Sequence, residues 1–195
     1  MLRLTPVVRN LVIINVMVFF ALLIMPGLAQ YLVVFGFQSP HFKPYQLFTY
    51  MFTHLEFLHI FFNMLVLATT GPILENFWGQ KKFLIFYLVT GIGAAVFHQI
   101  LSMYVYPEAA NIPMLGASGA GYGILMAFGM MFPNMEVMLL LPPVPIKAKY
   151  MVWVMGVMTL FINGTQGVAH FAHLGGIIFA FILLRIWRSQ DGSYF

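Results

Sequence analysis

Long apolar stretches recur along the whole chain, and this pattern constrains the fold more than any other feature. They cover residues 8–26, 58–77, 83–105, 116–132, 149–163 and 169–188. An α-helix of about 20 apolar residues crosses the hydrocarbon core of a bilayer. Only 7% of the residues are charged, against about 25% in soluble domains. The sequence therefore predicts an all-α membrane protein, with six transmembrane helices in a single domain over residues 1–195.

The stretch between the first two predicted spans differs from the rest of the chain. Residues 27–57 carry Pro40 and Pro44 among many aromatic side chains. Such a segment is too broken for a span and too apolar for a solvated loop. We expect an interfacial, partly helical loop that lies in the membrane surface.

The distribution of lysine and arginine predicts the orientation. With six spans, one side of the membrane receives Arg3, Arg9, Lys81, Lys82, Lys147, Lys149, Arg185 and Arg188. The other side receives only Lys43. Because positive residues concentrate in cytoplasmic loops, we expect a multi-pass protein with both termini cytoplasmic, in the cell membrane of a bacterium. The net charge of +4 is then a topology signal, and no nucleic-acid partner is expected.

Uncommon polar side chains lie at the start of three predicted spans. They are His59 and Asn63 in the second, Ser118 and Tyr122 in the fourth, and His170 and His173 in the sixth. All three of these spans begin at the outer face, and each side chain lies within roughly 10 Å of its helix start. We therefore expect these groups to share one layer of the bundle.

This layer has the groups needed for serine catalysis. The chain has no cysteine and its only aspartate, Asp191, lies in the polar tail, so neither a thiol nucleophile nor a full triad is available. Neutral histidine is suited to activate a serine, which favours a Ser118–His173 dyad. Tyr122 would orient the imidazole. His59, Asn63 and the Ser118 amide would donate to the oxyanion.

Small residues indicate close helix packing at the same place. Gly119, Gly123 and Ala127 are spaced four apart in the fourth span, and Gly176 and Ala180 in the sixth. Small residues at this spacing let helix backbones approach closely. A serine side chain is short, so a Ser118–His173 hydrogen bond requires such an approach.

Two other functions remain open from the residues. A histidine-based metal or haem site between His59, His170 and His173 is one, although His-Glu-x-x-His is absent. A non-catalytic protein that binds membrane proteins is the other. His98 has no counterpart at a matching position in another span and is interpreted as structural, and His54 is interpreted as a loop-anchoring hydrogen bonder.

At these residues the chain resembles the rhomboid family of intramembrane serine proteases. The family's Gly-x-Ser-Gly motif matches Gly116–Gly119, followed by Tyr122, and its Ala-His-x-Gly-Gly motif matches Ala172–Gly176. Two further motifs match His54, His59, Asn63 and Met64, and then Glu75, Gly79, Lys82 and Phe83. The family's Trp-Arg loop element reads Tyr45-Gln46 here, and Ala180 stands where glycine is common.

The resemblance implies a six-helix rhomboid-like bundle whose active site opens to water on the outer side. It also implies that Ser118 is the nucleophile, His173 the base, and His59 and Asn63 part of the oxyanion site. His170 is not the base, because it lacks the glycine pair that follows His173. The implied reaction is hydrolysis of peptide bonds in or near transmembrane helices of substrate proteins in the bilayer, with no cofactor and no metal.

Overall fold

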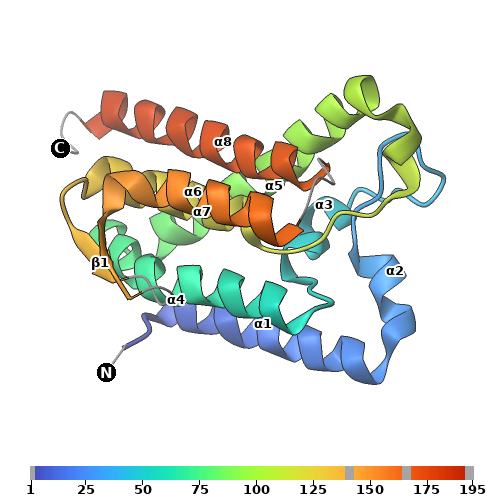
Figure 1. The fold of residues 1–195 in the computed structure, drawn as a ribbon, viewed down its shortest axis with the longest axis horizontal. Helices are drawn as coiled ribbons and strands as arrows, with labels where there is room; N and C mark the ends of the chain where they lie inside the picture. Colours follow the sequence, from blue (N-terminus) through green and yellow to red (C-terminus); the bar gives the residue numbers. More distant parts are fainter. Residues whose placement is uncertain (1–2, 139–142, 164–167, 192–195) are drawn as a thin grey trace.

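The computed structural model describes residues 3–138, 143–163 and 168–191. Its long helices lie side by side in a bundle, and α1 begins at the same end at which α8 finishes (Figure 1). In the described parts of the chain, the long helices are α1 (Pro6–Ile24), α4 (Phe57–Trp78), α5 (Gln80–Val105), α6 (Ser118–Met131), α7 (Ala148–Asn163) and α8 (Val168–Asp191).

These helices lie over the six predicted ranges, and the mainly helical fold is confirmed. Among the described residues, four segments are long and apolar enough to cross a membrane: Pro6–Ile24, Phe57–Trp78, Gln80–Val105 and His170–Ser189. The helices α6 and α7 are shorter, with 14 and 16 residues. The count of six membrane crossings therefore stays a prediction. At the C-terminal end, α8 continues to Asp191, so the predicted polar tail begins as helix.

A short β-hairpin that the sequence analysis did not predict joins α6 to α7. Its strands are β1 (Glu136–Met138) and β2 (Pro145–Lys147), which pair antiparallel with Val137 opposite Ile146. The strand ends are exposed and contribute little to the core. The prediction of an all-α protein is therefore wrong in one respect, because this small β-hairpin lies outside the bundle.

The short helix α6 lies at the centre of the bundle, where α4, α5, α7 and α8 all pack against it. Its side chains Ala120, Ile124, Ala127 and Phe128 have no solvent exposure. A helix surrounded in this way need not span the full bilayer, which explains why the fourth apolar segment is short. The outer helix α1 packs mainly on α4.

The small residues of α6 face two neighbouring helices. A Cβ placed on Gly176 of α8 would lie 2.0 Å from the Gly119 carbonyl oxygen. On Gly119 itself a Cβ would lie 2.6 Å from the Cβ of Ala94, and on Gly123 it would lie 2.9 Å from the Cβ of Thr90. The expected close approach between α6 and α8 is present, and α5 shares it.

The carboxylate of Glu75 connects the end of α4 to the start of α1. It accepts hydrogen bonds from the amides of Val7 at 3.0 Å and Val8 at 2.9 Å, and from the hydroxyl of Thr5. A negative side chain at a helix N-terminus satisfies unpaired amides and is favoured by the helix dipole. This contact joins residues about 70 positions apart and fixes α1 against the bundle.

The predicted loop between α1 and α4 is folded rather than extended. It contains the helices α2 (Ala29–Leu32) and α3 (Gln46–Thr49) and the 3₁₀ turns η1 (Pro26–Leu28) and η2 (Tyr50–Phe52). A third turn, η3 (Pro107–Asn111), follows α5. The loop is also joined to the segment before α6, because Val34 and Met114 exchange backbone hydrogen bonds. Its position in the membrane surface stays a prediction.

Gln46 stabilises this loop at the point where the sequence departs from the family motif. Its side chain is buried, accepts a hydrogen bond from the Lys43 amide at 3.0 Å and donates to the His41 carbonyl at 3.2 Å. The neighbouring Tyr45 is half exposed. The glutamine thus anchors the loop through backbone groups, without an arginine.

Candidate active site

Ser118 and His173 lie in direct contact. Ser118 is the first residue of α6, His173 lies in the second turn of α8, and the serine Oγ is 3.0 Å from the histidine Nε2. His173 is 9% exposed. The two residues are 55 positions apart in the sequence, and the contact between Gly119 and Gly176 brings their helices together. This is the geometry that a serine nucleophile and a histidine base require.

The segment that leads into Ser118 is held by two hydrogen bonds. Gly116 has a positive φ of 105°, which favours glycine, and its amide donates to the Tyr50 carbonyl at 2.9 Å. The Ala117 amide donates to Nε2 of His54 at 3.3 Å. The loop-anchoring hydrogen bond expected of His54 is therefore made with the Ala117 amide. The need for a positive φ at Gly116 could not be read from the motif alone.

His54 accepts that hydrogen bond in a fully buried position. Burial lowers the pKa of His54 from 6.5 to about 3, and the nearby His59 ring adds to the shift. The rings of His54 and His59 meet edge to face with their centroids 4.9 Å apart. A histidine that stays neutral keeps a lone pair for the Ala117 amide. The buried environment therefore maintains the hydrogen bond that holds the backbone just before Ser118.

Tyr122 stacks on the imidazole of His173. The ring centroids are 4.3 Å apart and the planes differ by 18°. Tyr122 lies one helical turn after Ser118 on α6, so the tyrosine and the serine contact the same imidazole. The Tyr122 ring thus lies against the imidazole whose Nε2 faces Ser118, and its orienting role stays a prediction.

His59 and Asn63 lie on α4 and line the same cavity as Ser118. The Nδ2 of Asn63 donates to the His59 carbonyl, one turn earlier, at 2.8 Å. An asparagine amide carries a second N–H, so one donor remains beyond this helix bond. The His59 ring packs on the Cα side of Gly116, where a Cβ would lie 2.6 Å from the ring.

The cavity around these residues has a volume of about 500 Å³. Besides the polar groups, its walls include Leu55, Glu56, Leu58, Phe62, Val66, Leu115, Gly121, Leu125 and Met155. A space of this size accommodates a short stretch of peptide. Sequence reasoning missed the apolar walls, although Phe62 and Val66 follow His59 and Asn63 at helical spacing and could have been found that way.

His170 takes a different position from His173. The two rings are 6.4 Å apart at a steep angle, and His173 is the one that contacts Ser118. Across residues 3–138, 143–163 and 168–191, no three histidine or carboxylate side chains come together as a metal site would require. His59, His170 and His173 therefore do not form the ligand set of the metal alternative.

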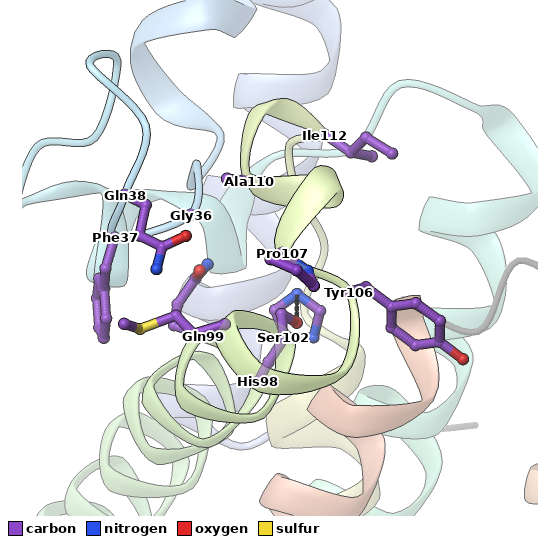
Figure 2. A pocket seen from close by; sticks show the side chains of 11 residues that line it. Gly36, Phe37, Gln38, His98, Gln99, Ser102, Tyr106, Pro107, Ala110 and Ile112 are labelled. Carbon is purple, nitrogen blue, oxygen red and sulfur yellow. Dashed lines mark hydrogen bonds between the residues drawn. The ribbon is translucent and has the colours of Figure 1, made fainter.

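A second serine–histidine pair lies on α5. Oγ of Ser102 is 3.3 Å from Nε2 of His98, one turn earlier, beside a cavity of about 10 Å³ (Figure 2). Such a volume holds about one water molecule and excludes a peptide. The buried His98 packs near the Phe171 ring. This arrangement agrees with a structural role for His98.

Comparison with known proteins gives consistent matches. A protein-family model described as Rhomboid domain matches residues 41–190. Rhomboid-like protease 3 of Toxoplasma gondii is 30% identical over 157 residues, which are 78% of this chain and 56% of that protein. Rhomboid protease AarA of Providencia stuartii is 34% identical over 147 residues, 66% of this chain and 50% of that protein.

A mitochondrial relative gives a shorter match. Rhomboid protein 1 of Saccharomyces cerevisiae is 37% identical over 98 residues, which are 48% of this chain and 27% of that protein. The chain thus spans about a quarter to just over half of the length of these relatives. Their source organisms include a bacterium and eukaryotes.

Proposed function

The chain belongs to the rhomboid family of membrane proteins, and we propose that it is an intramembrane serine endopeptidase with a Ser118–His173 dyad. The observation that carries this proposal is the 3.0 Å contact between the serine Oγ and the histidine Nε2, beside a cavity of about 500 Å³. Relatives whose names describe them as rhomboid proteases give further support.

In the proposed reaction, the Ser118 hydroxyl donates its proton to Nε2 of neutral His173 as its oxygen attacks a peptide carbonyl. The protonated imidazole then gives that proton to the departing amine, which leaves an ester on Ser118. A water molecule then attacks this ester and loses a proton to His173. The imidazolium returns that proton to the Ser118 oxygen as the ester bond breaks, so the acid product leaves and the dyad is restored. Tyr122 holds the imidazole plane throughout, because its ring stacks on His173.

The tetrahedral intermediate carries a negative oxygen that needs hydrogen-bond donors. The second N–H of Asn63, a ring N–H of His59 and the amide of Ser118 at the start of α6 are the candidates. The first amides of a helix have no partner within the helix, and the helix dipole also favours an anion there. Loss of one such donor typically lowers the rate by about 10²–10³.

The proposed substrates are transmembrane proteins that enter from the lipid between α4 and α7. Phe62 and Val66 of α4 and Met155 of α7 line the cavity, so it extends between these two helices. A carbonyl within a helix is already hydrogen-bonded, and the substrate must unwind before attack. Glycine or proline near the cleaved bond should therefore favour cleavage, as should a small residue before it.

The proposed orientation has six membrane crossings, cytoplasmic termini and a site open to the outer side of a bacterial cell membrane. It rests on eight basic residues predicted on one side and Lys43 on the other. A cysteine introduced at exposed Leu55, near the site, or at exposed Met138, in the hairpin, tests it, because the native chain has no cysteine. In intact cells, an impermeant maleimide should label only the first.

Cleavage in liposomes tests the function itself. The purified protein is reconstituted with single-span membrane proteins, and new chain ends are identified by mass spectrometry. We expect cleavage by the native protein and by Ser102→Ala, and none by Ser118→Ala or His173→Ala. If the folded native protein bound these single-span proteins and cleaved none of them, the protease proposal would be wrong. The function would then be that of a non-catalytic protein that binds membrane proteins.

A further inference from the structure

A separate cavity of about 390 Å³ lies at the other end of the bundle from Ser118 and His173. Its lining includes Trp78, Gly79, Lys81, Lys82 and Trp187. These residues come from the turn between α4 and α5 and from the last part of α8.

The length of α4 separates the two cavities. His59 lies in the first turn of α4 and Trp78 is its last residue, so the rise along the helix is roughly 30 Å. The proposed protease chemistry therefore makes no use of this second cavity. In a membrane, it would lie near the opposite surface.

The lining combines positive charge with aromatic walls. The Lys82 ammonium lies 4.7 Å from the centre of the Trp187 ring, and the rings of Trp78 and Trp187 meet edge to face at 5.5 Å. The Lys81 side chain is exposed. Lysine beside tryptophan is typical of the level at which lipid headgroups meet the hydrocarbon region.

The start of α5 adds donors to the same place. Its N-cap is Gly79, which has no side chain to accept hydrogen bonds from the first-turn amides. These amides and the helix dipole favour an anion. None of the described residues that line the cavity is a carboxylate, and Glu75 of α4 is buried and bonded to α1.

We propose that this cavity binds the phosphate group of an anionic phospholipid. Two lysines and the α5 amides supply the charge and donors for a phosphate. The surface beside them favours a lipid over a free phosphate ion, because Phe77, Leu84 and Ile85 are exposed apolar side chains that can contact acyl chains. The proposal does not depend on protease activity.

Lipid binding to the full chain in detergent, counted by native mass spectrometry, tests the proposal. The double variant Lys81→Gln/Lys82→Gln should bind phosphatidylglycerol at least about tenfold more weakly than the native protein does. The matched control is Lys147→Gln/Lys149→Gln, which removes two lysines from the same predicted side, one of them also over an aromatic ring, Tyr150, at 5.1 Å. This control should bind as the native protein does.

Three outcomes would overturn the proposal. If both double variants bound phosphatidylglycerol equally weakly, the lipid would be attracted by general surface charge. If neither bound it more weakly than the native protein, Lys81 and Lys82 would not form a lipid site. Inorganic phosphate forms the third arm: if it bound with the same lysine dependence and the protein showed no preference for phosphatidylglycerol over phosphatidylcholine, the cavity would be a free-anion site. Thermal unfolding of each variant confirms that it is folded.

Tryptophan fluorescence provides a second readout. Of the three tryptophans, Trp153 is 72% exposed on α7, and the other two line the cavity. In a Trp153→Phe background all tryptophan emission therefore comes from the cavity. Brominated phosphatidylglycerol should quench it more than brominated phosphatidylcholine at equal low concentration, and Lys81→Gln/Lys82→Gln should remove that difference. Equal quenching by both lipids would contradict the proposal.

Discussion

Gly176 of α8 lies directly against the backbone of Gly119 of α6, and a Cβ on Gly176 would stand 2.0 Å from the Gly119 carbonyl oxygen. Ser118 precedes one of these glycines and His173 lies three residues before the other. The distance of 3.0 Å between Oγ and Nε2 is therefore set by a contact between two backbones. Backbone atoms cannot rotate away from an added methyl group, so this contact tolerates only glycine.

Substitution of Gly176 by alanine should therefore separate the two helices. We expect a loss of stability of about 1–3 kcal/mol, as for other overpacked sites, and a cleavage rate lower by at least about tenfold. The control is Gly156→Ala on α7, where no described atom lies within 4 Å of the new Cβ. Thermal unfolding and liposome cleavage measure both effects. Native-like cleavage by a folded Gly176→Ala protein would contradict this explanation.

Gly116→Ala should lower activity through His59. The residue has a φ of 105°, and a Cβ there would lie 2.6 Å from the His59 ring. Gly79 also has a positive φ, of 79°, but no described atom would lie within 4 Å of its Cβ. Both alanine variants should lose about 1–3 kcal/mol of stability from backbone strain. Only Gly116→Ala should also lose cleavage, and an equal loss in both would indicate strain alone.

The stacking of Tyr122 on His173 predicts a difference between two substitutions. Tyr122→Phe keeps a ring 4.3 Å from the imidazole and should retain most of the cleavage rate. Tyr122→Ala removes the ring and should lower the rate by about tenfold, the size of an aromatic pair interaction. Rates at saturating substrate, compared with thermal unfolding, separate orientation from folding. Equal rates in the two variants would show that stacking does not orient the base.

The buried His54 predicts loss of stability in acid. Its pKa is about 3 in the fold and 6.5 in the unfolded chain, so below pH 6.5 the unfolded chain binds a proton that the folded protein does not. Stability should therefore fall as the pH drops from about 6.5 toward 3, with a contribution of up to about 1.4 kcal/mol per pH unit.

His54→Gln isolates this contribution. The variant keeps an oxygen that can accept the hydrogen bond of the Ala117 amide but has no group that titrates in this range. Its stability relative to the native protein at pH 8 gives the pH-independent cost of the substitution. Between pH 6.5 and pH 5, the unfolding temperature of the variant should fall less steeply. Parallel slopes would mean that His54 does not stay neutral in the fold.

The long helices could be predicted because their apolar segments are continuous. Predicted and observed helices agree within a few residues, for example 58–77 against Phe57–Trp78. The polar layer was also predictable, since Ser118, Tyr122 and His173 lie near helix starts where orientation follows from the span count. The predictions were correct where the residues of a single segment were enough to indicate its structure.

Contacts between distant segments could not be predicted in this way. Nothing local to Glu75 indicates that it binds the amides of Val7 and Val8, and nothing local to Val34 indicates pairing with Met114. The β-hairpin was missed because each of its strands has only three residues. The packing of Gly123 on Thr90 likewise depends on α5, a neighbour that the small-residue spacing does not identify.

Labelling of the purified protein with a fluorophosphonate tests most directly whether Ser118 is an activated nucleophile. We predict that the label maps to Ser118 and disappears in Ser118→Ala and His173→Ala. It should persist in Ser102→Ala and His98→Ala, which alter the second serine–histidine pair. Labelling that persisted in Ser118→Ala, or a folded native protein that took no label, would contradict the Ser118–His173 dyad.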